Sequence, residues 1–278
     1  MNIFQILLLA FVQGMAELLP ISSSAHVIVA EKLMGLDPAS PEMTFLLVML
    51  HTGTMFAVLF YFWRRWLKIW KAHSHQSLIQ ALVVATLVTG AVGLTLKKLI
   101  EKVFIGGESA EIEQIFGNLK LVAAALFSAG VLILIAGLSR KKSGGELSLK
   151  NSAVIGMVQG LCLPFRGFSR SGATISTAML LGVSRELAED FSFALAVILT
   201  PPVILRELMR LVKSGELSHE LTPQLFFPGL AGMVFSFFAG LLALRWLASW
   251  MEKGRWHWFG YYCVTASLFV FFLSSQGY

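Results

Sequence analysis

Hydrophobic residues gather in long blocks along this chain. A transmembrane helix needs about 20 consecutive apolar residues, and several blocks reach that length with few or no charged side chains. The blocks cover residues 44–63, 77–96, 119–138, 189–205, 225–244 and 257–274. The pattern therefore predicts an all-α integral membrane protein with six transmembrane helices.

Two further apolar segments are interrupted in the middle by Pro, Gly and Ser. Segment 3–34 is broken near residues 20–24, and segment 151–183 is broken near residues 164–172. Each segment is either one long kinked helix or a re-entrant helical hairpin that returns to the side it entered from. Irregular backbone is tolerated at membrane depth only where it lines a cavity or is buried in protein. We therefore expect two hairpins around a buried cavity.

The two broken segments also resemble each other. Gln13-Gly14 precedes a proline and a serine run in the first segment, and Gln159-Gly160 precedes a proline and a Ser-Arg-Ser run in the second. Corresponding broken segments in two halves are typical of inverted repeats built around a central site. We expect a single membrane domain over residues 1–278. Its two halves are 1–138, with hairpin 3–34, and 139–278, with hairpin 151–183.

Composition supports the membrane prediction and argues against a nucleic-acid partner. Hydrophobic residues make up 56% of the chain, charged residues make up 14%, and the mean hydropathy is +0.74. The net charge is +6, but the basic residues lie in short loops between apolar blocks, where membrane topology places them. These three loops contain Arg64, Arg65, Lys68 and Lys71; Arg140, Lys141, Lys142 and Lys150; and Arg245, Lys253 and Arg255.

Basic loops mark the cytoplasmic side of a membrane protein. If both broken segments are hairpins that do not cross, six spans place all three basic loops in the cytoplasm and both termini outside. Loops 101–118 and 213–224 then lie outside as well. The first hairpin enters from the outside and the second from the cytoplasm, so their tips are expected to meet near the midplane.

The first break carries groups suited to acid/base and nucleophilic chemistry. Gln13 and Glu17 are four residues apart and share a helix face. A carboxylate in the hydrocarbon region costs several kcal/mol, so it normally faces a polar cavity and marks a functional site, although an interfacial position is the alternative. Ser22, Ser23, Ser24 and His26 follow within one short turn. The serines are candidate nucleophiles or, alternatively, simple helix caps.

The second break carries groups suited to binding phosphate. A helix beginning near Ser171 would present free backbone N–H groups to an anion. Arg170 adds a forked, permanently charged donor, and Ser169, Ser171 and Thr174 add hydroxyl groups. The alternative for Arg170 is snorkelling to the interface or a purely structural pair with Glu17.

Other polar residues in apolar stretches are interpreted as structural. His51 is a lone histidine in a span and is left outside the expected site, although it could line the same cavity. The charged patch at the start of the fourth span is expected to be a solvated interfacial turn, and both cysteines are expected to be packing residues. These residues are Arg185, Glu186, Glu189 and Asp190, and Cys162 and Cys263.

The two breaks resemble the motifs of the undecaprenyl-diphosphate phosphatase family, also called the bacitracin-resistance family. The resemblance spans nearly the whole chain. The first motif is represented by Gln13, Glu17, Pro20, Ser22, Ser23 and His26. The second runs from Gly167 to Thr174, with one departure: Arg166 stands where the family has proline, next to an apparent one-residue insertion. This added cation is expected to contact substrate, where it either strengthens diphosphate binding or alters which phosphorylated lipid is preferred.

The resemblance implies hydrolysis of undecaprenyl diphosphate to the monophosphate and inorganic phosphate in the bacterial cytoplasmic (inner) membrane. This reaction recycles the cell-wall lipid carrier and is linked to bacitracin resistance. We predict that Ser23 attacks the terminal phosphorus, that Glu17 or His26 takes its proton, and that Arg170 with the donors of the second loop holds the phosphate oxygens. Ser22 is an alternative nucleophile, and direct attack by water stays open. The remaining substrate contacts are expected from Gln13, Ser22, Arg166, Ser169, Ser171 and Thr174.

A divalent cation and two competing function classes complete these expectations. The family resemblance implies Mg²⁺ or Ca²⁺ bridging Glu17 and the diphosphate, with Gln13 as a further ligand that is weaker than an acid. The expected partner is a polyprenyl diphosphate lipid, and a homodimer is left open. A transporter or flippase of polyprenyl phosphate lipids is the main alternative. A noncatalytic membrane scaffold would not explain polar groups buried at both breaks.

Overall fold

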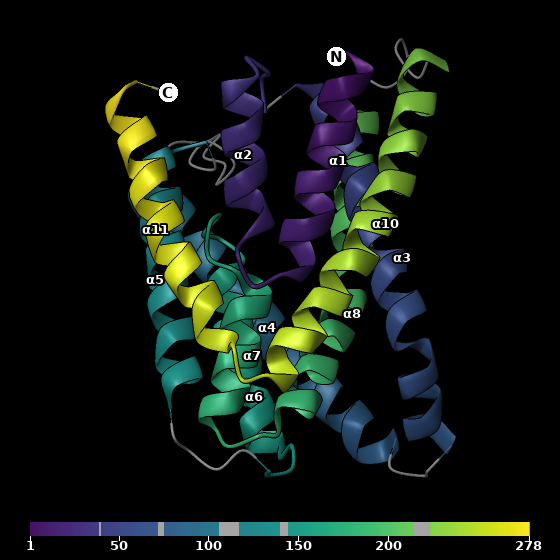
Figure 1. Cartoon of the computed structure of the whole chain (residues 1–278), viewed down its shortest axis with the longest axis vertical. Helices are drawn as coiled ribbons and strands as arrows, with labels where there is room; N and C mark the ends of the chain where they lie inside the picture. The colour runs from purple at the N-terminus through teal and green to yellow at the C-terminus, as the bar shows by residue number, and fades with distance from the viewer. Residues whose placement is uncertain (39, 72–74, 106–116, 140–143, 214–222, 278) are drawn as a thin grey trace.

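The computed structural model describes residues 1–38, 40–71, 75–105, 117–139, 144–213 and 223–277, and helices account for most of this part of the chain (Figure 1). The helices are α1 (Ile3–Leu18), α2 (Ser23–Leu33), α3 (Pro41–Lys71), α4 (His75–Ile100), α5 (Leu119–Leu138), α6 (Leu149–Cys162), α7 (Arg170–Leu180), α8 (Arg185–Lys213), α10 (Pro223–Glu252) and α11 (Trp256–Ser275). A π-helical turn, η1 (Glu101–Ile105), continues α4.

Six of these helices are long and apolar enough to cross a membrane. They cover Pro41–Lys71, Gln76–Val103, Leu119–Leu138, Arg185–Met209, Phe226–Glu252 and Trp256–Ser275. The sequence prediction of six spans is confirmed. Most helices run beyond the apolar blocks, because backbone hydrogen bonding continues into residues that reach the polar interface.

The first broken segment forms two helices joined by a tight turn. α1 ends at Leu18, and Leu19 adopts an extended backbone conformation because it precedes Pro20. Ser22 caps α2, which packs back against α1. Figure 1 shows α1 running from the N-terminal end into the bundle and α2 returning toward that same end.

The second broken segment has the same form and comes from the opposite end of the bundle (Figure 1). α6 ends at Cys162, and α7 begins at Arg170 with Ser169 as its cap. The turns of the two hairpins touch each other. The Gly167 N–H donates to Ser24 Oγ over 3.2 Å, and Ser171 Oγ donates to the Leu19 carbonyl over 3.4 Å.

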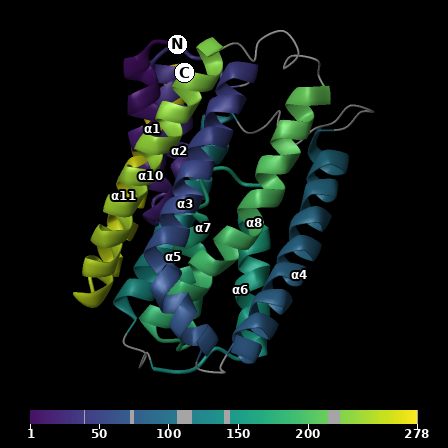
Figure 2. The same cartoon turned by 90° about the vertical axis from the view of Figure 1, so that its right-hand side faces the viewer.

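A glycine sets the depth at which each hairpin packs against a long helix. α1 packs on α10 at Gly14, where a Cβ would lie 2.7 Å from the Ser236 carbonyl oxygen. α6 packs on α4 at Gly160, where a Cβ would lie 2.9 Å from the Thr89 carbonyl oxygen. Small residues allow such close backbone approach between membrane helices. Figure 2 shows α4 beside α6, on the side away from α1 and α11.

The main core lies where α3, α5, α7, α8 and α11 meet. Phe62 of α3 stacks on Phe193 of α8 with ring centroids 5.2 Å apart. Trp256 at the start of α11 is fully buried, and its indole N–H donates to Ser176 Oγ of α7 over 3.0 Å. Cys162 and Cys263 are buried and free of disulfides, as expected for packing residues. The core therefore fixes α7, whose first residue is Arg170.

The charged patch at the start of α8 differs from its prediction as a solvated turn. Glu189 is only 3% exposed and Asp190 only 8% exposed. Arg65 of α3 explains part of this burial, because its guanidinium lies 3.0 Å from Asp190 and 2.9 Å from the exposed Glu186. These ion pairs tie α3 to α8. Hydropathy alone does not reveal a partner from another helix.

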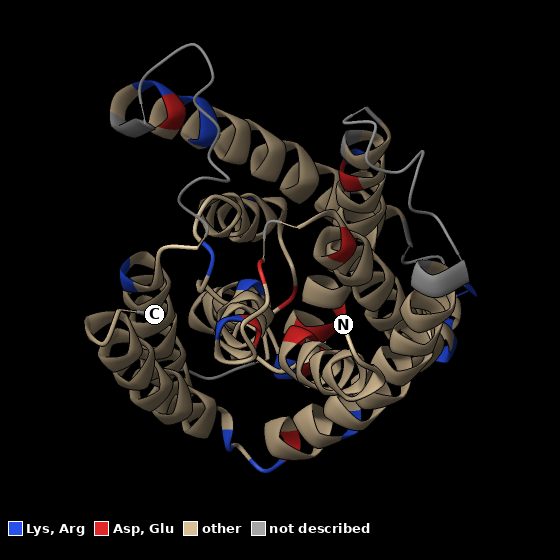
Figure 3. Cartoon of the chain, turned by 90° about the horizontal axis from the view of Figure 1, so that it is seen from above, with Lys and Arg blue, Asp and Glu red and all other residues tan. Residues whose placement is uncertain are grey.

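Charged residues occupy few positions on the bundle, and most of each helix in Figure 3 carries neutral side chains. Of the three basic loops, residues 140–142 lie outside the described residues. The same holds for 106–116 and 214–222 in the two loops expected outside.

Candidate active site

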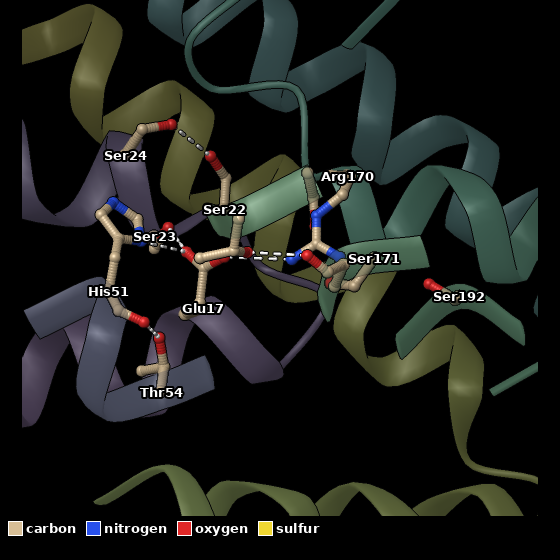
Figure 4. A network of polar contacts seen from close by, with 12 residues as sticks. Glu17, Ser22, Ser23, Ser24, His51, Thr54, Arg170, Ser171 and Ser192 are labelled. Atoms are coloured by element: carbon tan, nitrogen blue, oxygen red, sulfur yellow. Dashed lines mark hydrogen bonds and ion pairs between the residues drawn. The ribbon is translucent and has the colours of Figure 1, made fainter. Parts of the chain in front are cut away.

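Glu17 connects the two hairpins. It lies in the last turn of α1, and its side chain is largely buried. Its Oε2 accepts hydrogen bonds from Ser23 Oγ at 2.5 Å and from Gln13 Nε2 at 3.2 Å, and its Oε1 accepts one from Arg170 Nη2 at 3.0 Å (Figure 4). The acid of the first hairpin and the guanidinium of the second are thus in direct contact, as the sequence analysis expects for one shared site.

Ser23 is aimed at Glu17 by an unusual backbone turn. The preceding residue, Ser22, has φ +69°, and it is the one non-glycine residue with positive φ in the described chain. Side-chain bonds hold this conformation: Ser22 Oγ accepts from the Ala25 N–H at 3.4 Å and lies 3.3 Å from Ser24 Oγ. Strained backbone of this kind is found where the surrounding structure fixes a functional geometry. A hydroxyl bonded to a carboxylate that can take its proton is an activated nucleophile.

Arg170 offers a second donor group beside the contact with Glu17. It is the first residue of α7 and lies where the helix has free N–H groups. Nη2 is bonded to Glu17, but Nη1 is buried and has no hydrogen-bond partner among the described residues. An arginine donor left without a partner in a buried position suits a charged acceptor such as a phosphate oxygen.

His51 belongs to this cluster, although the sequence analysis left it out. It lies on α3, with Nδ1 3.0 Å from Gln13 Nε2 and 3.7 Å from Glu17 Oε2 (Figure 4). Since the Gln13 amide nitrogen is a donor, Nδ1 accepts in this arrangement. The signal that could have identified His51 is its ionisable side chain within an apolar span.

His26 turns away from Glu17 despite its place in the motif. Its Nδ1 lies 2.8 Å from the Ser22 carbonyl oxygen, and its Nε2 lies 2.6 Å from the Tyr262 hydroxyl of α11. Both ring nitrogens are therefore engaged. Of the two candidate bases, Glu17 is the one in contact with Ser23.

The hydroxyl groups expected to hold phosphate bond mainly to the protein. Ser169 Oγ accepts from the Gly172 N–H at 3.2 Å and so caps its own helix. Thr174 Oγ1 donates to the Arg170 carbonyl over 2.9 Å and lies 2.7 Å from Ser192 Oγ. Together with the Ser171 bond to the first hairpin, these contacts fix the start of α7. Their visible effect is to orient Arg170.

Arg166 lies in the turn of the second hairpin, next to the Gly167 contact with Ser24. Its charge acts on two groups of the first half, His51 and Glu31. Glu31 lies on the same face of α2 as Ser24, because seven residues make about two helical turns. Glu31 is only 1% exposed, and neither carboxylate oxygen has a hydrogen-bond partner in the described structure.

Comparison with known proteins explains this combination of residues. The family of bacitracin resistance protein BacA matches residues 6–269 of the chain. The chain belongs to this family. It is 54% identical over 276 residues to undecaprenyl-diphosphatase 2 of Acinetobacter baylyi, covering 96% of each chain. It is 33% identical to the undecaprenyl-diphosphatase of Rhodopirellula baltica, covering 98% of each chain. It is 32% identical to that of Korarchaeum cryptofilum, covering 97% of this chain and 98% of the relative.

The family resemblance inferred from the two motifs is thus confirmed. The match begins within α1 and ends within α11, so it includes both hairpin turns and all or most of each of the six apolar helices. It includes Arg166, so the proline replaced in the second motif does not remove the chain from the family.

The site contains few metal ligands for a family with an implied divalent cation. No group of three or more His, Cys, Asp or Glu side chains suited to a metal occurs among the described residues. Glu17 supplies carboxylate oxygens at the site centre, and Gln13 turns its amide nitrogen toward them. This set fits Mg²⁺, which is commonly held by one or two carboxylates together with substrate phosphates and water.

Proposed function

We propose that this chain hydrolyses undecaprenyl diphosphate to undecaprenyl phosphate and inorganic phosphate. The relatives named undecaprenyl-diphosphatase align over nearly the whole chain. The structural observation that carries the proposal is the contact chain from Ser23 through Glu17 to Arg170, which joins a hydroxyl, a carboxylate and a guanidinium across the two hairpins.

Ser23 is the proposed nucleophile and Glu17 the proposed general base. Ser23 Oγ forms a bond to the terminal phosphorus while the bond from that phosphorus to the bridging oxygen breaks, and undecaprenyl phosphate leaves. The Ser23 proton moves to Glu17, 2.5 Å away. Water then hydrolyses the phosphoserine and releases inorganic phosphate. Ser22 as nucleophile and direct attack by water are the alternatives that trapping experiments separate.

Arg170 is proposed to neutralise charge on the transferred phosphoryl group. Phosphoryl transfer depends chiefly on positioning and on stabilising charge at the phosphate oxygens. The Nη1 group without a partner and the N-terminus of α7 supply donors for this purpose. Contact with substrate would also weaken the electrostatic attraction between Arg170 and Glu17. The Glu17 carboxylate would then be a stronger base toward Ser23.

Arg166 is proposed to bind the second phosphate of the diphosphate. Its charge reaches His51, which contacts Gln13 at the site centre. A second cation beside Arg170 matches a headgroup with two phosphates better than one with a single phosphate. Gln13 and Ser22 complete the proposed contacts, and Ser169, Ser171 and Thr174 hold the loop that presents them.

A divalent cation, Mg²⁺ or Ca²⁺, is proposed at Glu17 with Gln13. When bound, it would neutralise charge on the diphosphate oxygens and so favour attack by an oxygen nucleophile. The support is the carboxylate of Glu17, a hard oxygen donor at this point of the site; Gln13 would join it through its amide oxygen.

The topology is proposed to be two re-entrant hairpins in an inverted repeat, with both termini outside the bacterial inner membrane. The hairpins reverse inside the bundle from opposite ends (Figure 1), and each packs its first helix on a long helix through a glycine. Inverted repeats of this kind also occur in transporters. The Ser23 to Glu17 contact exceeds what translocation of an anionic lipid requires, so hydrolysis is favoured over flipping.

The proposal is tested by phosphate release from undecaprenyl diphosphate by purified protein in detergent. We expect Glu17→Gln, Ser23→Ala and Arg170→Lys each to lower turnover by at least about 100-fold. Ser128→Ala is the matched control, since Ser128 is an exposed α5 residue whose hydroxyl bonds only its own helix, at the Ala124 carbonyl. Near-normal turnover in all three site variants would remove the assignment. Lipid translocation without phosphate release would favour the transporter instead.

A further inference from the structure

Tyr262 of α11 contacts the site from a helix that neither motif includes. Its hydroxyl lies 2.6 Å from His26 Nε2, and its ring is nearly parallel to the imidazole, with centroids 5.6 Å apart and an interplanar angle of 12°. The contact joins residues 236 positions apart in the chain. It is thus a tertiary contact in which the tyrosine hydroxyl meets the edge of the imidazole ring.

The two hydrogen bonds of His26 define its tautomer. A carbonyl oxygen can only accept, so the 2.8 Å contact with Ser22 requires the proton on Nδ1. In the neutral ring Nε2 then carries the lone pair and accepts from the Tyr262 hydroxyl. The hydrogen bond made by one ring nitrogen determines which nitrogen of a functional histidine carries the proton and how the ring is oriented.

We infer that Tyr262 is a positioning residue for His26 and that α11 is therefore part of the active site. The backbone of Ser22 fixes one edge of the imidazole, and the Tyr262 hydroxyl fixes the other edge. Since Ser22 also sets the turn that aims Ser23 at Glu17, the same contact braces the first turn of α2. The inference rests on the proposed phosphatase function, in which His26 belongs to the catalytic motif.

The opposing interpretation is that Tyr262 only satisfies its own hydroxyl at the membrane-facing surface. Tyr262 is 46% exposed. A hydroxyl group in hydrocarbon is stabilised by any hydrogen-bond acceptor within reach. This interpretation predicts that the hydroxyl can be removed without an effect on turnover. The two interpretations therefore differ in a measurable way.

Tyr262→Phe is the decisive variant because it keeps the aromatic ring and removes only the hydroxyl. Tyr261→Phe is the matched control: Tyr261 is the neighbouring residue, is 47% exposed, and packs its ring on His257 and Trp258. The assay is phosphate release from undecaprenyl diphosphate by the full chain, with kcat and KM measured separately. The tautomer of His26 is followed by ¹⁵N chemical shifts, and folding by Tm.

We expect Tyr262→Phe to lower kcat about tenfold, because an imidazole held at only one edge positions the first turn of α2 less well, with KM within about twofold of the unmodified chain. The Nδ1–H tautomer of His26, set by the Ser22 carbonyl, should persist in both variants, whereas the ¹⁵N signal of Nε2 should shift in Tyr262→Phe and stay unchanged in Tyr261→Phe, because only the first variant removes the donor to Nε2. Addition of Tyr262→Phe to His26→Ala should cause no further loss of kcat, because Tyr262 acts through His26.

Unchanged kcat in Tyr262→Phe would overturn the inference while leaving the phosphatase assignment intact. So would a loss of kcat that is equal in the presence and absence of His26, or one accompanied by a matching loss of Tm. Failure of the unmodified chain to release phosphate would instead contradict the proposed function. The two failures are thus distinguishable in one set of assays.

Discussion

Glu17 and Arg170, 153 positions apart in the sequence, are joined by a 3.0 Å hydrogen bond between the tips of the two hairpins. Each charge is the partner that allows the other to remain buried. Burying an unpaired charge costs several kcal/mol, whereas the pair as a whole contributes little net stability. The contact is thus a neutral resting arrangement that an anionic substrate can compete for.

Removal of one charge should harm stability more than removal of both. We expect Arg170→Gln to lower the free energy of unfolding by about 3 kcal/mol, since it leaves Glu17 buried without a cation. The double variant Glu17→Gln/Arg170→Gln should recover most of this loss in thermal unfolding and remain inactive. A double variant as unstable as Arg170→Gln would show that the arginine contributes through packing.

A covalent intermediate should form on one particular serine. With Ser23 as nucleophile, we expect rapid quenching with ³²P-labelled diphosphate to give a phosphoprotein in the unmodified chain and in Ser22→Gly. Ser23→Ala should give none and lose about three orders of magnitude of turnover or more. Label retained in Ser23→Ala would move the assignment to another nucleophile, and label absent from every variant would favour attack by water.

Ser22 should tolerate glycine better than alanine. Glycine adopts a φ of +69° at no steric cost, whereas alanine retains the strain and loses the cap. Loss of the capping hydroxyl costs about 1 kcal/mol with alanine and a few tenths with glycine. We therefore expect Ser22→Gly to keep higher turnover and Tm than Ser22→Ala. The reverse order would show that the positive φ at position 22 does not limit the stability of this turn.

The sequence could identify the charged side chains of the site, because a charge within an apolar segment is energetically costly at any depth in the membrane. Glu17 and Arg170 fall in this class, and the breaks at Pro20 and Pro164 located them between short helices. The direction in which each side chain points was harder to predict. His26 has the spacing of a base for Ser23, but its ring turns to Tyr262, a residue of α11 that no local pattern connects with it.

The sequence also does not show how each helix is rotated or which helix it packs against. The residues whose surroundings were predicted wrongly depend on both. His51 was left out because a single polar residue in a span does not reveal which neighbour it faces, and it faces Gln13. Glu189 and Asp190 are predicted to lie in solvent, but both are buried, and Asp190 pairs with Arg65 of α3. Both errors arise from tertiary contacts between distant segments.

Arg166 should affect substrate binding more than the chemical step, since its charge lies near His51 and Glu31 while Glu17 and Arg170 hold the reacting centre. We expect Arg166→Gln to raise KM for undecaprenyl diphosphate about tenfold with kcat nearly unchanged, the pattern of a lost binding contact. Lys32→Gln, on α2 beside Glu31, is the charge-matched control and should leave KM unaltered. A fall in kcat at constant KM would instead place Arg166 at the reacting phosphate.

The close approach of α1 to α10 should make Gly14 sensitive to a single methyl group. A Cβ there would lie 2.5 Å from Ala239 Cβ and 2.7 Å from the Ser236 carbonyl oxygen, so Gly14→Ala forces the helices apart. We expect a loss of about 1–3 kcal/mol in stability and a disproportionate loss of turnover, because α1 carries both Gln13 and Glu17. Gly90→Ala on α4 is the control, since a Cβ at Gly90 meets nothing within 4 Å. It should leave turnover unchanged and raise Tm slightly, as expected when alanine replaces glycine inside a helix. If Gly14→Ala matched this control in both Tm and turnover, the packing of α1 on α10 would not determine the position of Glu17.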